Sequence, residues 1–201
     1  MGETKGARTS ARLVESMLDL IQSRGYSGTG LNTVVEHAHA PKGSLYFHFP
    51  EGKEALGAKA VELAAERFRS LVASSALESR TPGEVVRRVI DVLAGMLVDS
   101  DFSLGCPVSV VTLEMGAQSE RLRDACAGAF DSWITPLAEY LGAHGQPRAA
   151  ARAVATTVVS AVEGAVIVSR AQRSVEPLRS AASVLAVLLD QGDARTAEAS
   201  W

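Results

Sequence analysis

The chain has 201 residues, of which 47% are hydrophobic and 21% charged, and its formal net charge is −3. This length and composition support a hydrophobic core, which excludes a disordered tail, a collagen-like chain and a disulfide scaffold. Up to Lys53 there are six basic and five acidic residues, whereas the remainder has 14 basic and 18 acidic residues. A mildly basic N-terminal segment on an acidic body permits a DNA contact confined to that segment.

The sequence also predicts a cytoplasmic protein that needs no metal and no cofactor. Residues 1–12 are polar and form no secretory signal. The longest apolar stretch, residues 158–168, is interrupted by polar residues and is shorter than the roughly 20 residues of a membrane span. Cys106 and Cys126 do not complete a four-ligand zinc site, and His37 and His39 do not share a helical face.

Apolar residues recur with a helical period along nearly the whole chain, which predicts an all-α protein of about nine helices. The first helix is expected over about residues 9–24 and ends at Gly25, which suits a left-handed cap. A short second helix follows from Leu31, a short third one from near Pro41, and a long fourth one from around Gly52.

The rest of the chain is predicted to hold five further helices. Thr81-Pro82-Gly83-Glu84 is a capping box with proline at the first helical position, and it begins the fifth helix. Residues 105–115 are predicted to form the sixth, although their valine-rich stretch also fits a strand. The seventh, over residues 122–140, is expected to kink near Pro136. The last two are expected over residues 148–172 and 177–189, followed by a frayed tail that ends at Trp201.

The segment from Gly25 to Leu56 is the most informative part of the sequence. Two short helices separated by a few residues are the layout of a helix-turn-helix, whose second helix enters the major groove by its N-terminal end. That end is dense in short and polar residues, Lys42-Gly43-Ser44, and Gly43 lets the backbone approach a phosphate closely. The pattern therefore favours DNA binding through this helix.

The same segment resembles the TetR family of one-component transcriptional regulators. The matching residues are Gly25-Tyr26, Thr29, Val34, Ala38, Lys42-Gly43-Ser44-Leu45-Tyr46, His48-Phe49 and Lys53-Glu54. The loop Phe49–Glu54 is one residue longer than usual. Together with Gly105-Cys106-Pro107 and Glu163-Gly164-Ala165, this loop is similar to the LmrA/YxaF-like branch of the family.

Two residues depart from the family pattern. His39 stands where the turn usually has glycine, and a left-handed conformation is less easy for histidine. Pro41 stands where serine or threonine usually caps the recognition helix, so one hydroxyl for capping or phosphate contact is missing. These departures keep an alternative open, namely a helical interaction protein that has lost DNA binding.

The resemblance implies a helix-turn-helix DNA-binding domain over residues 1–54 and a ligand-binding and dimerisation domain over residues 55–201. It implies a repressor that a small lipophilic ligand releases from a pseudo-palindromic operator. The sequence holds no nucleophile elbow, P-loop or HExxH motif, which argues against an enzyme. Tyr26, Leu45 and Phe49 are expected in the core of the first domain. The residues expected to contact DNA are Thr29, Asn32, Thr33, Lys42, Gly43, Ser44, Tyr46, Phe47, His48 and Lys53.

The ligand site is expected to be an apolar cavity in the second domain, which takes a lipophilic or aromatic compound. Glu114 and Glu163 stand in apolar surroundings, where an unpaired carboxylate is costly. Each is therefore either paired or exposed, or one of them faces the cavity. The residues assigned to this site are Met96, Phe102, Cys106, Val110, Glu114, Phe130, Trp133, Ile134, Leu137, Glu163 and Ile167.

The last two predicted helices carry apolar faces that the chain's own core does not require. A partner chain is the natural cover for such faces, so a homodimer through both helices is expected. Its interface is assigned to Thr157, Val158, Ala161, Ala165, Val168, Leu178, Ala182, Leu185 and Leu189.

Overall fold

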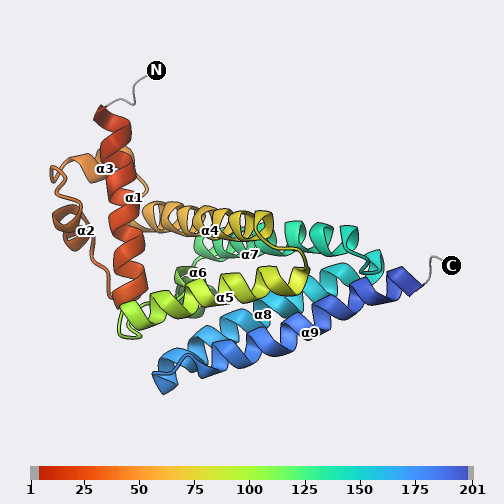
Figure 1. Ribbon diagram of the computed structural model, residues 1–201. Coiled ribbons are helices and arrows are strands. Elements are labelled where there is room, and N and C mark those ends of the chain that lie inside the picture. Colours follow the sequence, from red (N-terminus) through yellow and green to blue (C-terminus); the bar gives the residue numbers. More distant parts are fainter. Residues whose placement is uncertain (1–4, 199–201) are drawn as a thin grey trace. The chain divides into compact units, whose positions relative to one another are not determined.

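The computed structural model describes the backbone of residues 5–198 and the side chains of residues 6–190. Over these residues it is all-helical and has no strand, which confirms the predicted fold class (Figure 1). The nine helices of the described chain are α1 (Lys5–Arg24), α2 (Leu31–His37), α3 (Ser44–His48), α4 (Lys53–Leu77), α5 (Pro82–Asp99), α6 (Pro107–Met115), α7 (Glu120–Ala143), α8 (Arg148–Gln172) and α9 (Glu176–Glu198). The valine-rich sixth segment is therefore a helix and not a strand.

Most predicted boundaries agree with the structure within a few residues, and the differences have local causes. Helix α3 begins at Ser44 and not near Pro41, because the Ser44 N–H donates to the Pro41 carbonyl and closes a turn before the helix (2.9 Å). Helix α7 continues through Pro136. Helix α9 continues beyond residue 189 to Glu198, and the remaining predicted tail to Trp201 lies outside the described residues.

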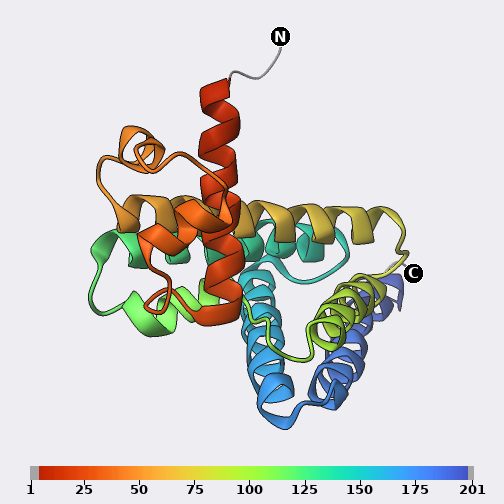
Figure 2. The same cartoon turned by 90° about the vertical axis from the view of Figure 1, so that its left-hand side faces the viewer.

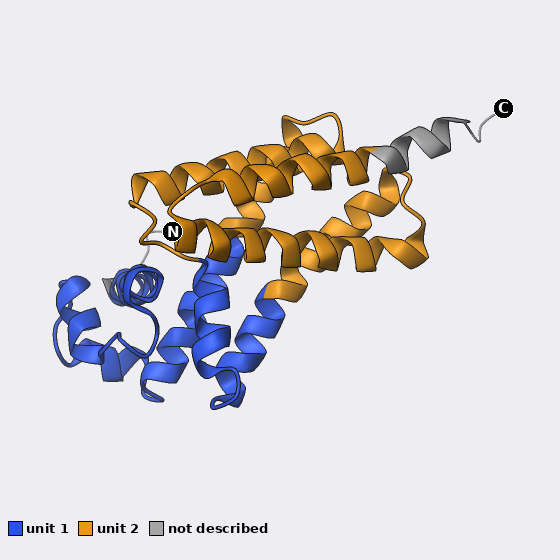
Figure 3. Ribbon diagram, turned by 90° about the horizontal axis from the view of Figure 1, so that it is seen from below, with its two compact units in different colours: residues 1–66, 106–129 blue, residues 67–105, 130–201 orange. Residues whose placement is uncertain are grey.

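The described residues form two compact units (Figure 3). Unit 1 consists of the chain up to Glu66 together with Cys106–Ala129, and unit 2 consists of Arg67–Gly105 together with the chain from Phe130 onward. Helices α4 and α7 are continuous across the division between the units. Helix α6 therefore groups with the N-terminal helices, although α5, which belongs to unit 2, lies between them in the sequence.

Unit 1 is built around α1. Helices α2, α3 and α6 each pack against it, and Figure 2 shows α2 and α3 on the same side of α1. The buried face of α1 carries Leu13, Met17 and Ile21, whose helical spacing forms one apolar stripe. Tyr26, Leu45 and Phe49 are also buried, which confirms their predicted place in this core.

Unit 2 contains a layer of three long helices, α5, α8 and α9, that pack against one another (Figure 1). The N-terminus of α5 carries the predicted capping residue, since the Thr81 hydroxyl accepts the N–H of Glu84. The Asp190 carboxylate of α9 accepts the Gly83 N–H at that same end (2.8 Å), which joins the two helices. Among the described helices, only α8 is long and apolar enough to cross a membrane by length and composition. One face of this helix, with Ala155, Val158 and Val162, belongs to the core of unit 2.

Candidate nucleic-acid interface and ligand cavity

Helix α3 exposes two large aromatic side chains. Tyr46 is 63% exposed and Phe47 is 81% exposed, on a helix of only five residues. Lys42 and Gly43 stand exposed immediately before it, and a side chain at Gly43 would have no neighbour within 4 Å. Exposed apolar side chains beside cationic and polar ones are typical of a surface that another molecule covers. This surface, residues 42–48, is called the α3 surface below.

The turn between α2 and α3 is stabilised by a side chain from α1. His39 has a φ of 46°, so it adopts the left-handed conformation that the family usually gives to glycine. The Arg12 guanidinium donates to the carbonyl oxygens of Ala38 and His39, the latter at 2.7 Å. These charge-assisted hydrogen bonds offset the unfavourable conformation of His39. The departure from the family pattern therefore leaves the turn intact.

The residues predicted to contact DNA are not equally accessible. Asn32, Lys42, Gly43, Tyr46 and Phe47 are exposed, and Thr33, Ser44, His48 and Lys53 are half-buried.

Thr29 is fully buried, which corrects the expectation that it contacts DNA. Its hydroxyl donates to the Gly25 carbonyl (2.7 Å) and stabilises the loop before α2.

Lys53 faces into unit 1 and is only partly exposed. Its ammonium lies 4.3 Å from the centroid of the Tyr26 ring, which is a cation–π geometry. Burial lowers the pKa of Lys53, and the negative charge of Glu114 opposes this change. Its predicted phosphate contact therefore requires the ammonium to turn away from Tyr26, and that contact stays a prediction.

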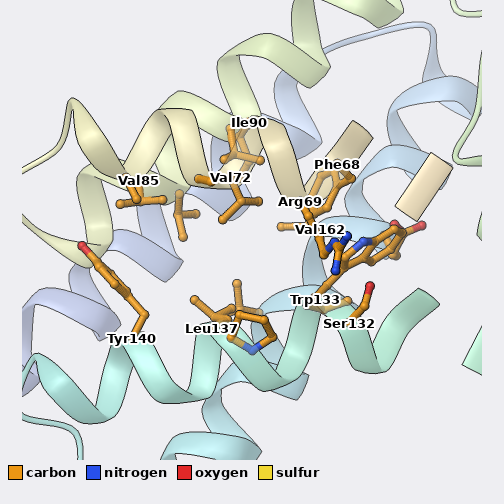
Figure 4. Close-up of a pocket in the computed structure, with 18 residues that line it drawn as sticks. Phe68, Arg69, Val72, Val85, Ile90, Ser132, Trp133, Leu137, Tyr140 and Val162 are labelled. Atoms are coloured by element: carbon orange, nitrogen blue, oxygen red, sulfur yellow. The ribbon is translucent and has the colours of Figure 1, made fainter. Parts of the chain in front are cut away.

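Unit 2 contains an apolar cavity of about 360 Å³ between α4, α5, α7 and α8 (Figure 4). The size lies within the range of small-molecule sites. The lining residues are Phe68, Arg69, Val72, Ala73, Ala76, Val85, Val86, Val89, Ile90, Ser132, Trp133, Pro136, Leu137, Tyr140, Val158, Val159, Val162 and Glu163.

Polar groups of the cavity are separated by an apolar middle. Figure 4 shows Arg69 and Ser132 close to Trp133 at one end and Tyr140 at the other. Trp133 also packs against Phe68 with the rings tilted at 52° and their centroids 4.7 Å apart. An elongated, mostly apolar space with polar groups near its ends suits a lipophilic compound with polar substituents.

Three of the residues predicted for the ligand site line this cavity, namely Trp133, Leu137 and Glu163. Phe130 contacts Trp133 from outside the lining, with ring centroids 5.4 Å apart. The other seven lie elsewhere. Phe102 and Ile134 pack against the core of unit 2, Met96 and Ile167 are exposed on the surface, and Cys106, Val110 and Glu114 belong to unit 1.

Glu114 is paired, as one of the predicted alternatives allowed. Its carboxylate accepts the backbone N–H of Ser27 at 2.6 Å.

None of the α4 and α5 residues that line the cavity was among the predicted site residues, although Met96 of α5 was predicted and does not line it. Phe68, Val72 and Ala76 recur every four residues on α4, and Val86 and Ile90 do so on α5. This spacing predicts a buried face but does not distinguish a face that fills a core from one that borders a cavity. Whether these residues fill a core or border a cavity depends on how the four helices pack together.

Most of the residues predicted for the dimer interface are already buried within the single chain. Six of the assigned residues are buried between α5, α8 and α9 within unit 2 itself, and only Thr157, Ala161 and Val168 retain accessible surface. The six are Val158, Ala165, Leu178, Ala182, Leu185 and Leu189. Helix α5 packs against α9, and α9 packs against α8, which the sequence pattern of α8 and α9 alone does not reveal.

The same two helices expose five large aliphatic residues, of which only Val168 was among the predicted interface residues. These are Ile167, Val168, Val184, Val187 and Leu188, between 42% and 60% exposed, and they are called the α8–α9 face below.

Comparison with known proteins gives consistent matches along the chain. Residues 13–67 match the model of bacterial regulatory proteins of the tetR family, and residues 82–184 match that of the LmrA/YxaF-like transcriptional regulator C-terminal domain. The HTH-type transcriptional regulator LmrA of Bacillus subtilis (strain 168) is 32% identical over 89% of this chain and 95% of its own length. The HTH-type transcriptional repressor DhaR of Mycobacterium sp. (strain GP1) is 28% identical over 86% of this chain and 88% of its own. A crystal structure of regulatory protein TetR from Rhodobacter sphaeroides superposes with a TM-score of 0.77 at 25% identity, covering 88% of this chain and 96% of that one.

Proposed function

Because the chain belongs to the TetR family of bacterial transcriptional regulators, we propose that its α3 surface binds operator DNA and that its cavity binds a lipophilic ligand that releases the operator. The observation that carries this proposal is the exposure of Tyr46 and Phe47 beside Lys42 on the second helix of a helix-turn-helix. We assign residues 1–54 to DNA binding and residues 55–201 to ligand binding and dimerisation. The chain acts in the cytoplasm, where a bacterium keeps its DNA.

The residues of the α3 surface have separate roles on the duplex. The Lys42 ammonium neutralises a phosphate, which contributes affinity for any sequence. Tyr46 and His48 reach base edges with their polar atoms, and Phe47 packs against a thymine methyl group or a sugar. Operator specificity therefore comes from the aromatic residues, and affinity for all DNA comes from Lys42.

A homodimer presents two α3 surfaces to one operator. A two-fold axis places them in successive major grooves, about 34 Å apart, which requires a pseudo-palindromic operator. The α8–α9 face supports this assembly, because it exposes five large aliphatic residues on the two helices whose sequence pattern predicts a dimer. We propose a second copy of the chain as the cover for this face.

Ligand binding releases the operator by a shift between two states of the dimer. Helix α4 runs from Lys53, close after α3, to Leu77, and its residues Phe68–Ala76 line the cavity. In one state of the dimer α4 is displaced, and the separation of the two α3 surfaces no longer matches the spacing of successive major grooves. A ligand that binds this state more tightly increases its population. The ligand acts only to the extent that it prefers this state.

DNA binding by the α3 surface is tested with Lys42→Ala and, as a matched control, Lys59→Ala, which removes an exposed lysine of α4 that pairs with Glu62. Lys42→Ala should weaken binding on all duplexes and reduce the salt slope by about 1, because one phosphate contact releases about one counterion. Tyr46→Ala and His48→Ala should weaken binding more on operator than on random DNA. Unchanged affinity in all three variants would refute the α3 surface as the interface.

Ligand binding is tested by screening a library of lipophilic aromatic compounds for quenching of Trp133 fluorescence. Trp133→Phe is the control, because Trp201 also emits. Compounds that enter the cavity should quench the wild-type chain and leave the residual emission of Trp133→Phe unchanged. A library without any compound that quenches or releases operator would refute the sensor role.

A further inference from the structure

One short segment of unit 1 contacts the chain on both sides of the helix-turn-helix. This segment, residues 114–121, comprises the end of α6 and the first turn of α7. Before α2, the Glu114 carboxylate accepts the Ser27 N–H. After α3, the Ser119 hydroxyl donates to the Glu54 carboxylate (2.8 Å) and the Arg121 guanidinium donates to Glu51. Both flanks of the DNA-binding motif are thus held by residues far away in sequence.

Glu114 makes the most specific of these contacts, with the loop of residues 25–30. Gly25 has a φ of 79°, and a side chain there would place its Cβ 2.3 Å from the Glu114 Oε1. Glycine therefore lets the loop close directly on the carboxylate. The other carboxylate oxygen, Oε2, lies 2.6 Å from the Ser27 nitrogen, a short distance typical of a charge-assisted hydrogen bond.

The loop that Glu114 holds determines where α2 begins. Within the loop, the Thr29 hydroxyl donates to the Gly25 carbonyl and the Thr29 N–H donates to the Tyr26 carbonyl, and Leu31 follows as the first residue of α2. Helix α3 follows α2 after a tight turn and packs on the same helix, α1. Base contacts tolerate displacements of only a few tenths of an ångström, because hydrogen-bond distances span a narrow range. A displacement of α2 and α3 by this amount would therefore be enough to weaken base contacts at the α3 surface.

We propose that Glu114 is a positioning residue for operator recognition, which holds the loop of residues 25–30 so that the α3 surface fits the major groove. The inference rests on the proposed binding of DNA by that surface. The same segment also connects the ligand cavity with the DNA-binding motif. The Ser119–Glu54 and Arg121–Glu51 contacts join the start of α7 to the start of α4. Both of these helices line the cavity further along the chain.

Two substitutions separate this role from a simple charge effect. Glu114→Asp keeps the charge but shortens the side chain by one methylene, so the carboxylate no longer reaches Ser27. Glu114→Gln removes the charge but keeps an oxygen at the same reach. If Glu114 acted only through its charge, Gln would strengthen binding to all DNA and Asp would change nothing. Positioning predicts the opposite order, and Glu120→Gln controls for loss of an exposed negative charge in the same segment.

The experiment measures the affinity of the full chain for a duplex that the wild type selects from a random pool, together with amide hydrogen exchange at residues 25–30. We expect Glu114→Asp to bind the selected duplex about tenfold more weakly, the effect of one lost hydrogen bond to a charged acceptor, with an unchanged salt slope and faster exchange at Ser27. Glu120→Gln should keep the affinity and the slow exchange, and Glu114→Gln, which keeps the hydrogen bond but loses its charge assistance, should lie between this control and Glu114→Asp.

Two results would overturn the inference while leaving the proposed function intact: Glu114→Asp with wild-type affinity, or weakened binding without faster exchange at Ser27. A wild-type chain that selects no duplex would overturn the proposed function, and the inference with it.

Discussion

The two units use aromatic side chains in opposite ways. On unit 1, Tyr46 and Phe47 point outward from α3 and are mostly exposed to water. In unit 2, Phe68, Trp133 and Tyr140 line a cavity. Exposed aromatic groups and the walls of an apolar cavity both lack the favourable contacts that packed side chains make. Both features therefore suit the binding of a second molecule that supplies those contacts.

The difference indicates which kind of molecule completes each unit. The α3 surface combines exposed aromatic residues with Lys42, which suits a large anionic partner such as a DNA duplex. The cavity is concave and its middle is aliphatic, which suits a small lipophilic molecule. Unit 2 also has an outward face, the α8–α9 face, but this face is aliphatic and suits another copy of the chain.

The largest expected effect comes from the α8–α9 face. Val184→Glu places a charge in the proposed interface, opposite its own symmetry mate, and should convert the dimer to a monomer. Operator affinity should fall about 100-fold or more, because the two α3 surfaces no longer bind as a linked pair. Analytical ultracentrifugation and operator titration measure both effects.

Val98→Glu is the matched control for this variant. Val98 is 55% exposed, close to the 60% of Val184, but it lies on α5 outside the α8–α9 face. It should stay dimeric. If both variants dissociate to the same extent, or if both stay dimeric, the dimer interface lies elsewhere.

The next largest effect distinguishes inward from outward aromatic residues directly. Trp133→Ala should lower the free energy of unfolding by about 3 kcal/mol, because it enlarges a cavity that is already present. Phe47→Ala should change the same quantity by less than about 0.5 kcal/mol, since it removes an exposed side chain. Its operator affinity should instead fall about tenfold. Chemical denaturation measures the stability of both variants, and operator titration measures their affinity for DNA. A strongly destabilised Phe47→Ala would contradict this contrast between the two residues.

A smaller effect concerns Tyr26, which unit 1 buries. Burial raises the pKa of Tyr26 to about 12, and the charge of Glu54 adds to this change. Since the pKa of the folded state lies above the ordinary value of 10.0, the stabilisation is complete below that pH and is lost as pH rises through about 12. Tyrosinate absorbance of the wild type should show a late-titrating component that Tyr26→Phe lacks. Identical titration curves would refute the burial of this hydroxyl.

The smallest effect is a difference between the two cysteines. Burial raises the pKa of the Cys126 thiol, with a hydrogen bond from Thr112 opposing the change, whereas Cys106 retains accessible surface. A thiol reagent should therefore label Cys106 faster than Cys126 in the native chain, because thiolates are the reacting species. Mass spectrometry of Cys106→Ala and Cys126→Ala identifies which thiol reacts first, and faster labelling of Cys126 would contradict its burial.

The features that were predicted correctly are local in sequence. The helix-turn-helix, the burial of Leu45 and the capping of α5 at Thr81 each depend on residues within about one or two helical turns. The features that were missed depend on distant residues. Arg12 supports the turn at His39 from another helix. The hydrogen bond of Glu114 was one of the predicted alternatives, but its partner Ser27, which is distant in sequence, was not predicted.

The residues predicted for the dimer interface show why helical patterns alone are insufficient to locate such an interface. Leu178 and Leu185 lie on an apolar face of α9, as the spacing predicted, but α5 already covers that face within unit 2. The accessible residues Val184 and Val187 lie on another side of the helix. A helical pattern identifies which residues share a face, and only the arrangement of the other helices determines which face remains for a partner.

The most direct test of ligand-controlled DNA binding is a joint titration of one quenching compound against Trp133 fluorescence and against bound operator. The quenching and the release of operator should have the same midpoint. Val72→Phe, which narrows the cavity, should shift both midpoints together to higher concentration. Operator that stays fully bound when quenching is complete would contradict the proposed link between the cavity and the α3 surface.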